Sequence, residues 1–96
     1  MFGINDLFRF LYTTWNDYED RLVENTKQGD YEIDTCFCND TNKYETGISK
    51  LENDWIIVEE YNTKDEASIG HKKWVEFTKA EPKKAYSIQL EEWEEF

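Results

Sequence analysis

The chain has 96 residues, with 22 Asp and Glu against 11 Lys and Arg and a formal net charge of −11. Its length is that of one domain, and a chain this short has too little interior for a core and a deep, enclosed substrate cavity. The negative field repels nucleic acid and anionic membranes, and it attracts basic surfaces of other proteins. Direct nucleic-acid binding, membrane binding and a large enclosed active site are therefore disfavoured.

The charge is unevenly distributed along the chain. Residues 1–63 contain 14 acids and 5 bases, residues 64–84 contain 4 acids and 6 bases, and residues 85–96 contain 4 acids and no base. The sequence has no apolar run of about 18 residues or more and no signal-peptide pattern near Asp6 and Arg9. We therefore expect an acidic protein that stays in the cytoplasm where it is made.

The first half of the chain predicts one short helix followed by two hairpins. Apolar side chains at positions 4, 7, 8, 11 and 12 have the spacing of an amphipathic helix of about two turns, which must pack on another element to be stable. Residues 18–24 and 31–39 flank a turn that contains Gly29, and residues 44–49 and 55–61 flank a second turn. The last run begins with apolar residues only, which predicts a central strand covered on both faces.

The strongest local signal marks the start of a second helix. Thr63 followed by Glu66 forms a capping box, which satisfies two backbone donors, and Pro82 marks the end. Gly70 within this helix costs about 1 kcal/mol relative to Ala, so a close backbone approach would explain it. The spacing turns Ala67, Gly70, His71, Trp74, Val75 and Thr78 inward, and Lys72, Lys73, Glu76 and Lys79 mostly outward.

These elements predict an α+β fold with a four-stranded, mainly antiparallel sheet, packed by one long capped helix and accompanied by a short N-terminal helix. Three or more strands with a covering layer are enough for a stable small domain. Residues 1–90 form a single acidic domain in this interpretation, with residues 91–96 as an acidic and aromatic C-terminal tail. Residues 86–90 add either a last edge strand or a short helix.

Few residues of the chain have the chemistry of a catalytic or metal site. His71, the only histidine, lies on the inward side of the predicted helix, where a hydrogen-bonded packing role is commoner than acid–base catalysis. Cys36 and Cys38 lack the second pair of ligands that a structural zinc site requires. The sequence also has no Gly-rich phosphate loop and no nucleophile elbow. We therefore expect neither an enzyme nor a bound cofactor or metal.

Two acidic segments are candidates for binding a partner. Acids at alternate strand positions, together with acids of the preceding segment, would form a carboxylate comb that imitates a phosphate backbone; solvated strand faces are the alternative. In residues 91–96, two aromatics alternate with four acids, which suits a basic-rimmed apolar groove unless the aromatics fold back on the body. The comb comprises Asp17, Glu19, Asp20, Glu32 and Asp34, and the other candidates are Tyr31, Glu91, Glu92, Trp93 and Phe96.

Three segments of the chain carry a resemblance to a known group of proteins. They read YETGI at 44–48, WIIVEEYNTKDEA at 55–67 and GHKKWV at 70–75. In these segments the chain resembles small, functionally uncharacterised proteins of bacteriophages that infect low-GC Gram-positive hosts. The resemblance implies a phage origin, and small acidic phage proteins often block host nucleases, restriction enzymes, CRISPR effectors or immune signalling sensors.

The functional hypothesis is therefore a small acidic inhibitor of a host defence protein. It would act in the host cytoplasm by binding a basic surface of that protein, with mimicry of nucleic-acid charge as one mode. The alternative is a phage structural or assembly protein that oligomerises, through its N-terminal helix, without inhibitory activity. An enzyme centred on His71 or the cysteines is a third hypothesis.

Overall fold

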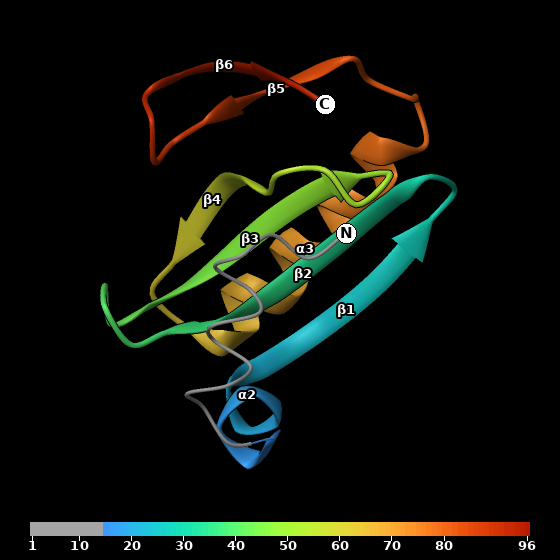
Figure 1. The fold of residues 1–96 in the computed structure, drawn as a ribbon. Helices are drawn as coiled ribbons and strands as arrows, with labels where there is room; N and C mark the ends of the chain where they lie inside the picture. The colour runs from blue at the N-terminus through green and yellow to red at the C-terminus, as the bar shows by residue number, and fades with distance from the viewer. Residues whose placement is uncertain (1–14) are drawn as a thin grey trace.

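The computed structural model describes residues 15–96, with side chains from Tyr18 onward (Figure 1). The helix predicted near the N-terminus lies outside the described residues. The elements are α2 (Trp15–Arg21), β1 (Leu22–Gln28), β2 (Tyr31–Cys38), β3 (Lys43–Lys50), β4 (Ile56–Tyr61), α3 (Lys64–Thr78), β5 (Lys84–Ser87) and β6 (Glu92–Glu95).

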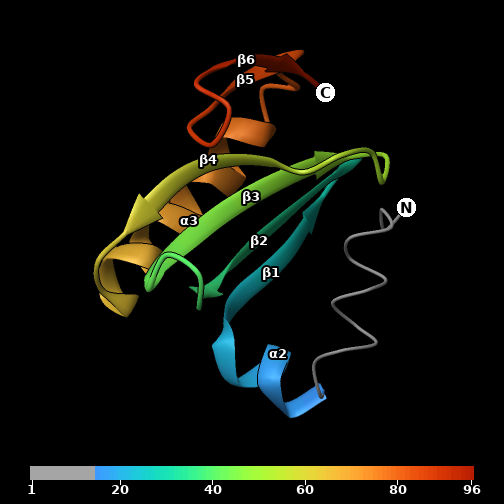
Figure 2. The same cartoon turned by 60° about the vertical axis from the view of Figure 1, so that its left-hand side comes forward.

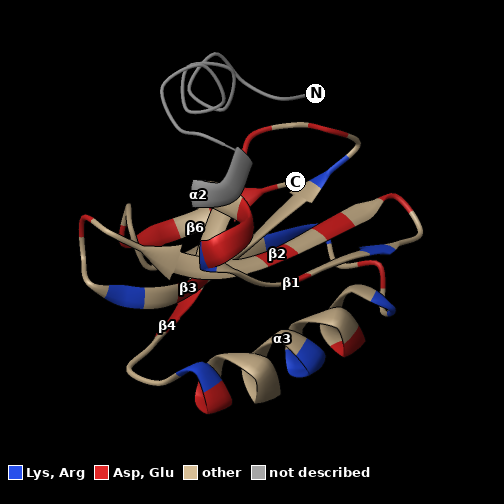
Figure 3. Ribbon diagram, turned by 90° about the horizontal axis from the view of Figure 1, so that it is seen from below, with Lys and Arg blue, Asp and Glu red and all other residues tan. Residues whose placement is uncertain are grey.

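Four of the strands form one antiparallel sheet in the order β1-β2-β3-β4. The helix α3 covers one face of this sheet, and α2 lies on the opposite side (Figure 3). In β2, buried side chains alternate with half-buried ones, because successive residues of a strand point to opposite faces. The predicted α+β fold with a four-stranded sheet and one long helix is confirmed.

Local sequence explains the ends of the predicted hairpin and helix. Gly29 has φ of 59°, a left-handed conformation that glycine adopts without steric cost, and it joins β1 to β2. The capping box is present, because the backbone N–H of Glu66 donates to the Thr63 hydroxyl at 3.1 Å and Thr63 N–H donates to the Glu66 carboxylate at 3.1 Å. A side chain at Gly70 would collide with the Tyr61 ring, so the expected close approach is confirmed.

Two predictions of strand position were wrong. Residues 18–21, expected to begin the first strand, belong to α2, and β1 begins only at Leu22. The strand β4, expected to be central, lies at an edge of the four-stranded sheet. The C-terminal segment covers this edge and explains the apolar residues of β4. Ile88 N–H donates to the Ile57 carbonyl at 2.9 Å, and Ala85 belongs to the buried core.

The C-terminal residues form a second, two-stranded sheet beyond β4 (Figure 2). Here β5 pairs with β6 in antiparallel register, and residues 91–96, which the sequence pattern set apart as a tail, contain β6. Phe96 then packs edge-on against the Tyr31 ring, with 5.4 Å between ring centroids. The hairpin is thus anchored to a core formed by Tyr31, Ile33, Ile48, Ile56, Val58 and Ala85.

Candidate functional site

His71 is fully buried between α3 and the sheet. Its Nδ1 lies 2.8 Å from the Thr35 hydroxyl on β2, and its Nε2 lies 2.8 Å from the Thr26 hydroxyl on β1. Burial holds the pKa of His71 below its ordinary value of 6.5, although the charges of Glu24 and Asp34 act in the opposite direction. The ring therefore ties α3 to two strands in its neutral form, which supports the packing role.

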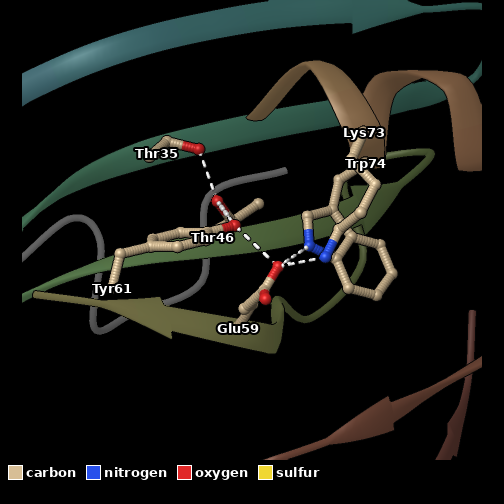
Figure 4. Close-up of polar contacts among 6 residues, drawn as sticks. All are labelled: Thr35, Thr46, Glu59, Tyr61, Lys73 and Trp74. Carbon is tan, nitrogen blue, oxygen red and sulfur yellow. Dashed lines mark hydrogen bonds and ion pairs between the residues drawn. The ribbon is translucent and has the colours of Figure 1, made fainter. Parts of the chain in front are cut away.

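A chain of hydrogen bonds continues across the sheet from Thr35, the β2 partner of His71, and Figure 4 shows it from Thr35 onward. The Thr35 and Thr46 hydroxyls lie 2.6 Å apart, and Thr46 lies 3.0 Å from the Tyr61 hydroxyl. Tyr61 in turn donates to the Glu59 carboxylate at 3.1 Å. Burial, with smaller effects of its neighbours, raises the pKa of Tyr61 to about 12, so this hydroxyl keeps its proton.

Glu59 is the charged end of this chain. Its Oε1 accepts hydrogen bonds from Lys73 Nζ at 2.6 Å and from Trp74 Nε1 at 2.8 Å, both on α3. Burial alone would raise the pKa of Glu59, but the hydrogen bonds from Lys73, Trp74 and Tyr61 outweigh it and hold the pKa below 4.5. Glu59 thus fastens α3 to β4 as a carboxylate.

The carboxylate fixes the direction of every hydrogen bond in the chain. Because Tyr61 gives its only proton to Glu59, its oxygen must accept from Thr46, and Thr46 must then accept from Thr35. Thr35 has no proton left for His71, so Nδ1 carries the ring proton and Nε2 accepts from the Thr26 hydroxyl. The network is satisfied throughout, which is typical of a buried polar cluster that stabilises a fold.

The carboxylate comb lies partly on the outer face, which we define as the sheet face away from α3. Asn25 Nδ2 donates to both Glu32 and Asp34, at 2.9 and 2.8 Å, and the Tyr18 hydroxyl of α2 donates to Asp34. These two acids are therefore half-buried and already engaged inside the molecule. Glu19 and Asp20 are exposed on α2, and the side chain of Asp17 lies outside the described part of the molecule.

The sequence pattern missed two further acids of the outer face. Glu45 of β3 and Glu60 of β4 are direct cross-strand partners, an arrangement that places like charges side by side. Burial and the charge of Glu60 raise the pKa of Glu45 above 4.5. Only knowledge of the β3–β4 register could have brought the pair together, since 15 positions separate the two residues.

The C-terminal hairpin carries a group of exposed apolar side chains, the hairpin patch: Tyr86, Leu90 and Trp93, which are 42%, 56% and 61% exposed. Tyr86 and Trp93 stack edge to face with 5.6 Å between ring centroids, and Lys84 Nζ lies 5.4 Å from the Trp93 ring. Glu91 and Glu92 are exposed beside the patch. The other two aromatic candidates are not available on this surface, because Tyr31 is buried and Phe96 packs against it.

An acidic groove lies where the end of the hairpin meets the segment that joins β3 to β4. Its volume is about 430 Å³, and its lining includes the carboxylates Glu52, Asp54, Glu94 and Glu95 as well as Trp55 and Phe96. In the described part of the chain, no three His, Cys, Asp or Glu side chains are placed to hold a metal ion. Among residues 15–96, no helix has the length and apolar character needed to cross a bilayer.

No family model, curated protein or solved structure matches this chain. The surface of the molecule, together with the resemblance noted in its sequence, is therefore the basis for a functional proposal.

Proposed function

We propose that this protein is an acidic binding domain that occupies a basic surface of another protein, a bacterial defence protein that acts on or senses nucleic acid. The observation that carries the proposal is the hairpin patch with its surrounding acids. Binding requires no cofactor and no chemical step by the chain itself.

The composition of the hairpin patch is that of a protein-binding surface. Aromatic side chains dominate binding energy at protein interfaces because they bury a large area with few rotatable bonds. Trp93 is 61% exposed although Phe96, three positions later, packs on the core. A contact with a partner would cover this apolar surface, and the surrounding carboxylates would select a partner with a basic rim.

The hairpin supports this role better than the carboxylate comb does. Glu32 and Asp34 already accept hydrogen bonds from Asn25 and Tyr18, so a partner would have to compete with those bonds. Glu91 of the hairpin turn and Glu92, the first residue of β6, are exposed near Trp93. We therefore place the main contact on the hairpin and give the outer face a supporting electrostatic role.

The chemistry of the partner follows from the charge. A net charge of −11 favours a surface that evolved to hold phosphate groups, because such surfaces carry Lys and Arg in excess. The resemblance to phage proteins supports a host defence protein as the partner that carries this basic surface.

Affinity capture tests the proposal. The full chain, immobilised, is exposed to lysates of Gram-positive hosts beside a Tyr86→Ala/Trp93→Ala variant and an Ile69→Ala control. Ile69 is a suitable control because it is 71% exposed on α3, away from the hairpin. We expect a nucleic-acid-handling protein to be retained by the wild type and the control, and to be lost with the hairpin variant.

Two further readouts decide between binding and inhibition. The retained protein should lose its nuclease or sensing activity when wild-type chain is added, and a duplex DNA oligonucleotide should compete for the same surface. Retention that is equal for all three chains, or a retained protein whose activity is unaffected, would refute the proposal.

A further inference from the structure

We infer that the outer edge of β6 is a pairing edge, which binds an extended, basic segment of the partner as an added antiparallel or parallel strand. This inference rests on the proposed function, since it specifies how the hairpin binds. The backbone hydrogen bonds of the hairpin determine to which edge each peptide group points.

In an antiparallel pair, residues that exchange backbone hydrogen bonds alternate with residues that point away from each other. Phe96 N–H donates to the Lys83 carbonyl at 2.9 Å, which makes 83 and 96 a hydrogen-bonded pair. The register Lys84↔Glu95, Ala85↔Glu94 and Tyr86↔Trp93 then continues this alternation. Trp93 and Glu95 therefore direct their N–H and carbonyl groups away from β5, to the outer edge of β6.

The opposite edge of the hairpin agrees with this assignment. By the same alternation, the even-numbered residues of β5 point away from β6, and Ile88 next to them donates its N–H to Ile57 of β4. The inner edge of the hairpin thus faces the main sheet (Figures 1 and 2). On the outer edge, no strand within residues 15–96 pairs with β6.

The outer edge of β1 is a second open strand edge and a weaker candidate. The strand β1 is also unpaired on its outer side among the described strands, but its ladder to β2 is irregular between Leu22 and Glu24. Such irregularities are a common protection of an edge against pairing. Of the two edges, only β6 combines outward peptide groups with an exposed aromatic side chain, Trp93.

Charge identifies the occupant of the β6 edge. The strand contains Glu92, Glu94 and Glu95, so a second copy pairing through the same edge would place carboxylates beside carboxylates. A strand with Lys or Arg at alternate positions would instead form opposite-charge cross-strand pairs. Added strands of this kind gain affinity from main-chain hydrogen bonds and specificity from side-chain contacts, here with Trp93.

The test uses ¹⁵N-labelled full chain and a capped peptide of about nine residues that alternates lysine and valine. On binding, amide exchange of Trp93 and Glu95 should slow by about tenfold or more, because their N–H groups become hydrogen-bonded. Glu94 serves as the internal reference, because its N–H already pairs with β5. The same peptide N-methylated at every residue keeps its charge but has no N–H donor on either edge, and it should not bind.

A pair of variants at one position separates backbone from charge. Glu95→Pro removes the outward N–H without breaking a bond to β5, and it should weaken binding about tenfold more than Glu95→Ala, which removes only the carboxylate. Equal binding of the N-methylated peptide, unchanged exchange at Trp93 and Glu95, or absence of peptide binding would overturn strand addition. In each of those cases, partner capture that is still lost with the Tyr86→Ala/Trp93→Ala variant would leave the proposed function intact.

Discussion

At the scale of single residues, the buried network gives His71 a defined protonation state. A carboxylate at Glu59 forces each hydroxyl in the chain to donate toward it, so the ring proton resides on Nδ1. The lowered pKa means that the folded protein binds a second ring proton, which would make His71 cationic, less tightly than the unfolded chain does. His71 thus contributes stability that is present above its ordinary pKa of 6.5 and is lost as the pH falls below it.

The state of the ring can be measured directly. We expect ¹⁵N NMR of the imidazole to report a neutral ring with the proton on Nδ1 at about pH 7, and a ring that stays neutral to lower pH than a histidine of ordinary pKa. A Glu59→Gln variant removes the charge that orients the chain, so the Nδ1 preference should weaken. An Nε2–H tautomer in the wild type, or a ring that titrates at its ordinary pKa, would contradict the network.

At position 70 the fold requires a residue without a side chain. Helix propensity alone predicts that Gly70→Ala stabilises α3 by about 1 kcal/mol. The added methyl group would collide with Tyr61, whose hydroxyl is held by Thr46 and Glu59, so we expect a net loss of about 2 kcal/mol. Thermal or urea unfolding measures this loss, with Lys72→Ala on the exposed side of α3 as control; a more stable Gly70→Ala protein would refute the collision.

At the scale of elements, the sequence predicted what depends on local periodicity and capping. Thr63 and Glu66 fixed the start of α3, and alternation along β2 assigned its two faces. The place of β4 in the strand order was harder to predict from the sequence. An apolar start is expected both for a central strand and for an edge strand that a separate hairpin covers. An edge strand at 86–90 was one of two alternatives, and β5 covers Lys84–Ser87, but β6 was not predicted because its acids lie on an exposed strand and leave no apolar alternation.

The β3–β4 pair allows a prediction with a defined pH dependence. The raised pKa of Glu45 means that the folded state holds this proton more tightly than the unfolded chain, so the ionised carboxylate destabilises the fold above that pKa. Glu45→Gln should therefore stabilise the protein by about 0.5 kcal/mol near neutral pH, and the gain should vanish below the ordinary value of 4.5.

Chemical unfolding at several pH values measures this gain. In a Glu60→Gln background the gain should be smaller, because the opposing charge of the cross-strand partner has been removed. A gain that is the same with and without Glu60, or that persists at acid pH, would show that the two carboxylates do not repel each other.

At the scale of the whole molecule, the candidate site could be predicted only in part. Composition predicts an acidic binding protein, which stays a prediction, and Trp93, one of the aromatic candidates of residues 91–96, is exposed in the structure. Tyr31 and Phe96 were selected by the same reasoning but lie against each other, because an aromatic residue among acids can equally face the core. Whether such an aromatic side chain is exposed or faces the core depends on tertiary packing, which the local sequence of residues 91–96 does not determine.

The net charge also predicts how binding depends on salt. Attraction between a chain of charge −11 and a basic partner is long-ranged, so the association rate should fall several-fold between about 50 and 300 mM salt. The dissociation rate should change less, because it depends on short-range contacts of the hairpin patch. Stopped-flow or surface-based kinetics with the captured partner distinguishes the two, and an association rate insensitive to salt would contradict electrostatic steering.

The most direct test of the central claim is the inhibition of the captured partner by single-residue variants. We predict that Trp93→Ala raises the concentration needed for half-inhibition by about tenfold or more, whereas Ile69→Ala, which removes an even more exposed apolar side chain from α3, has no effect. Circular dichroism and thermal unfolding serve as the check that both variants are folded. Equal inhibition by wild type and Trp93→Ala would contradict the assignment of binding to the C-terminal hairpin.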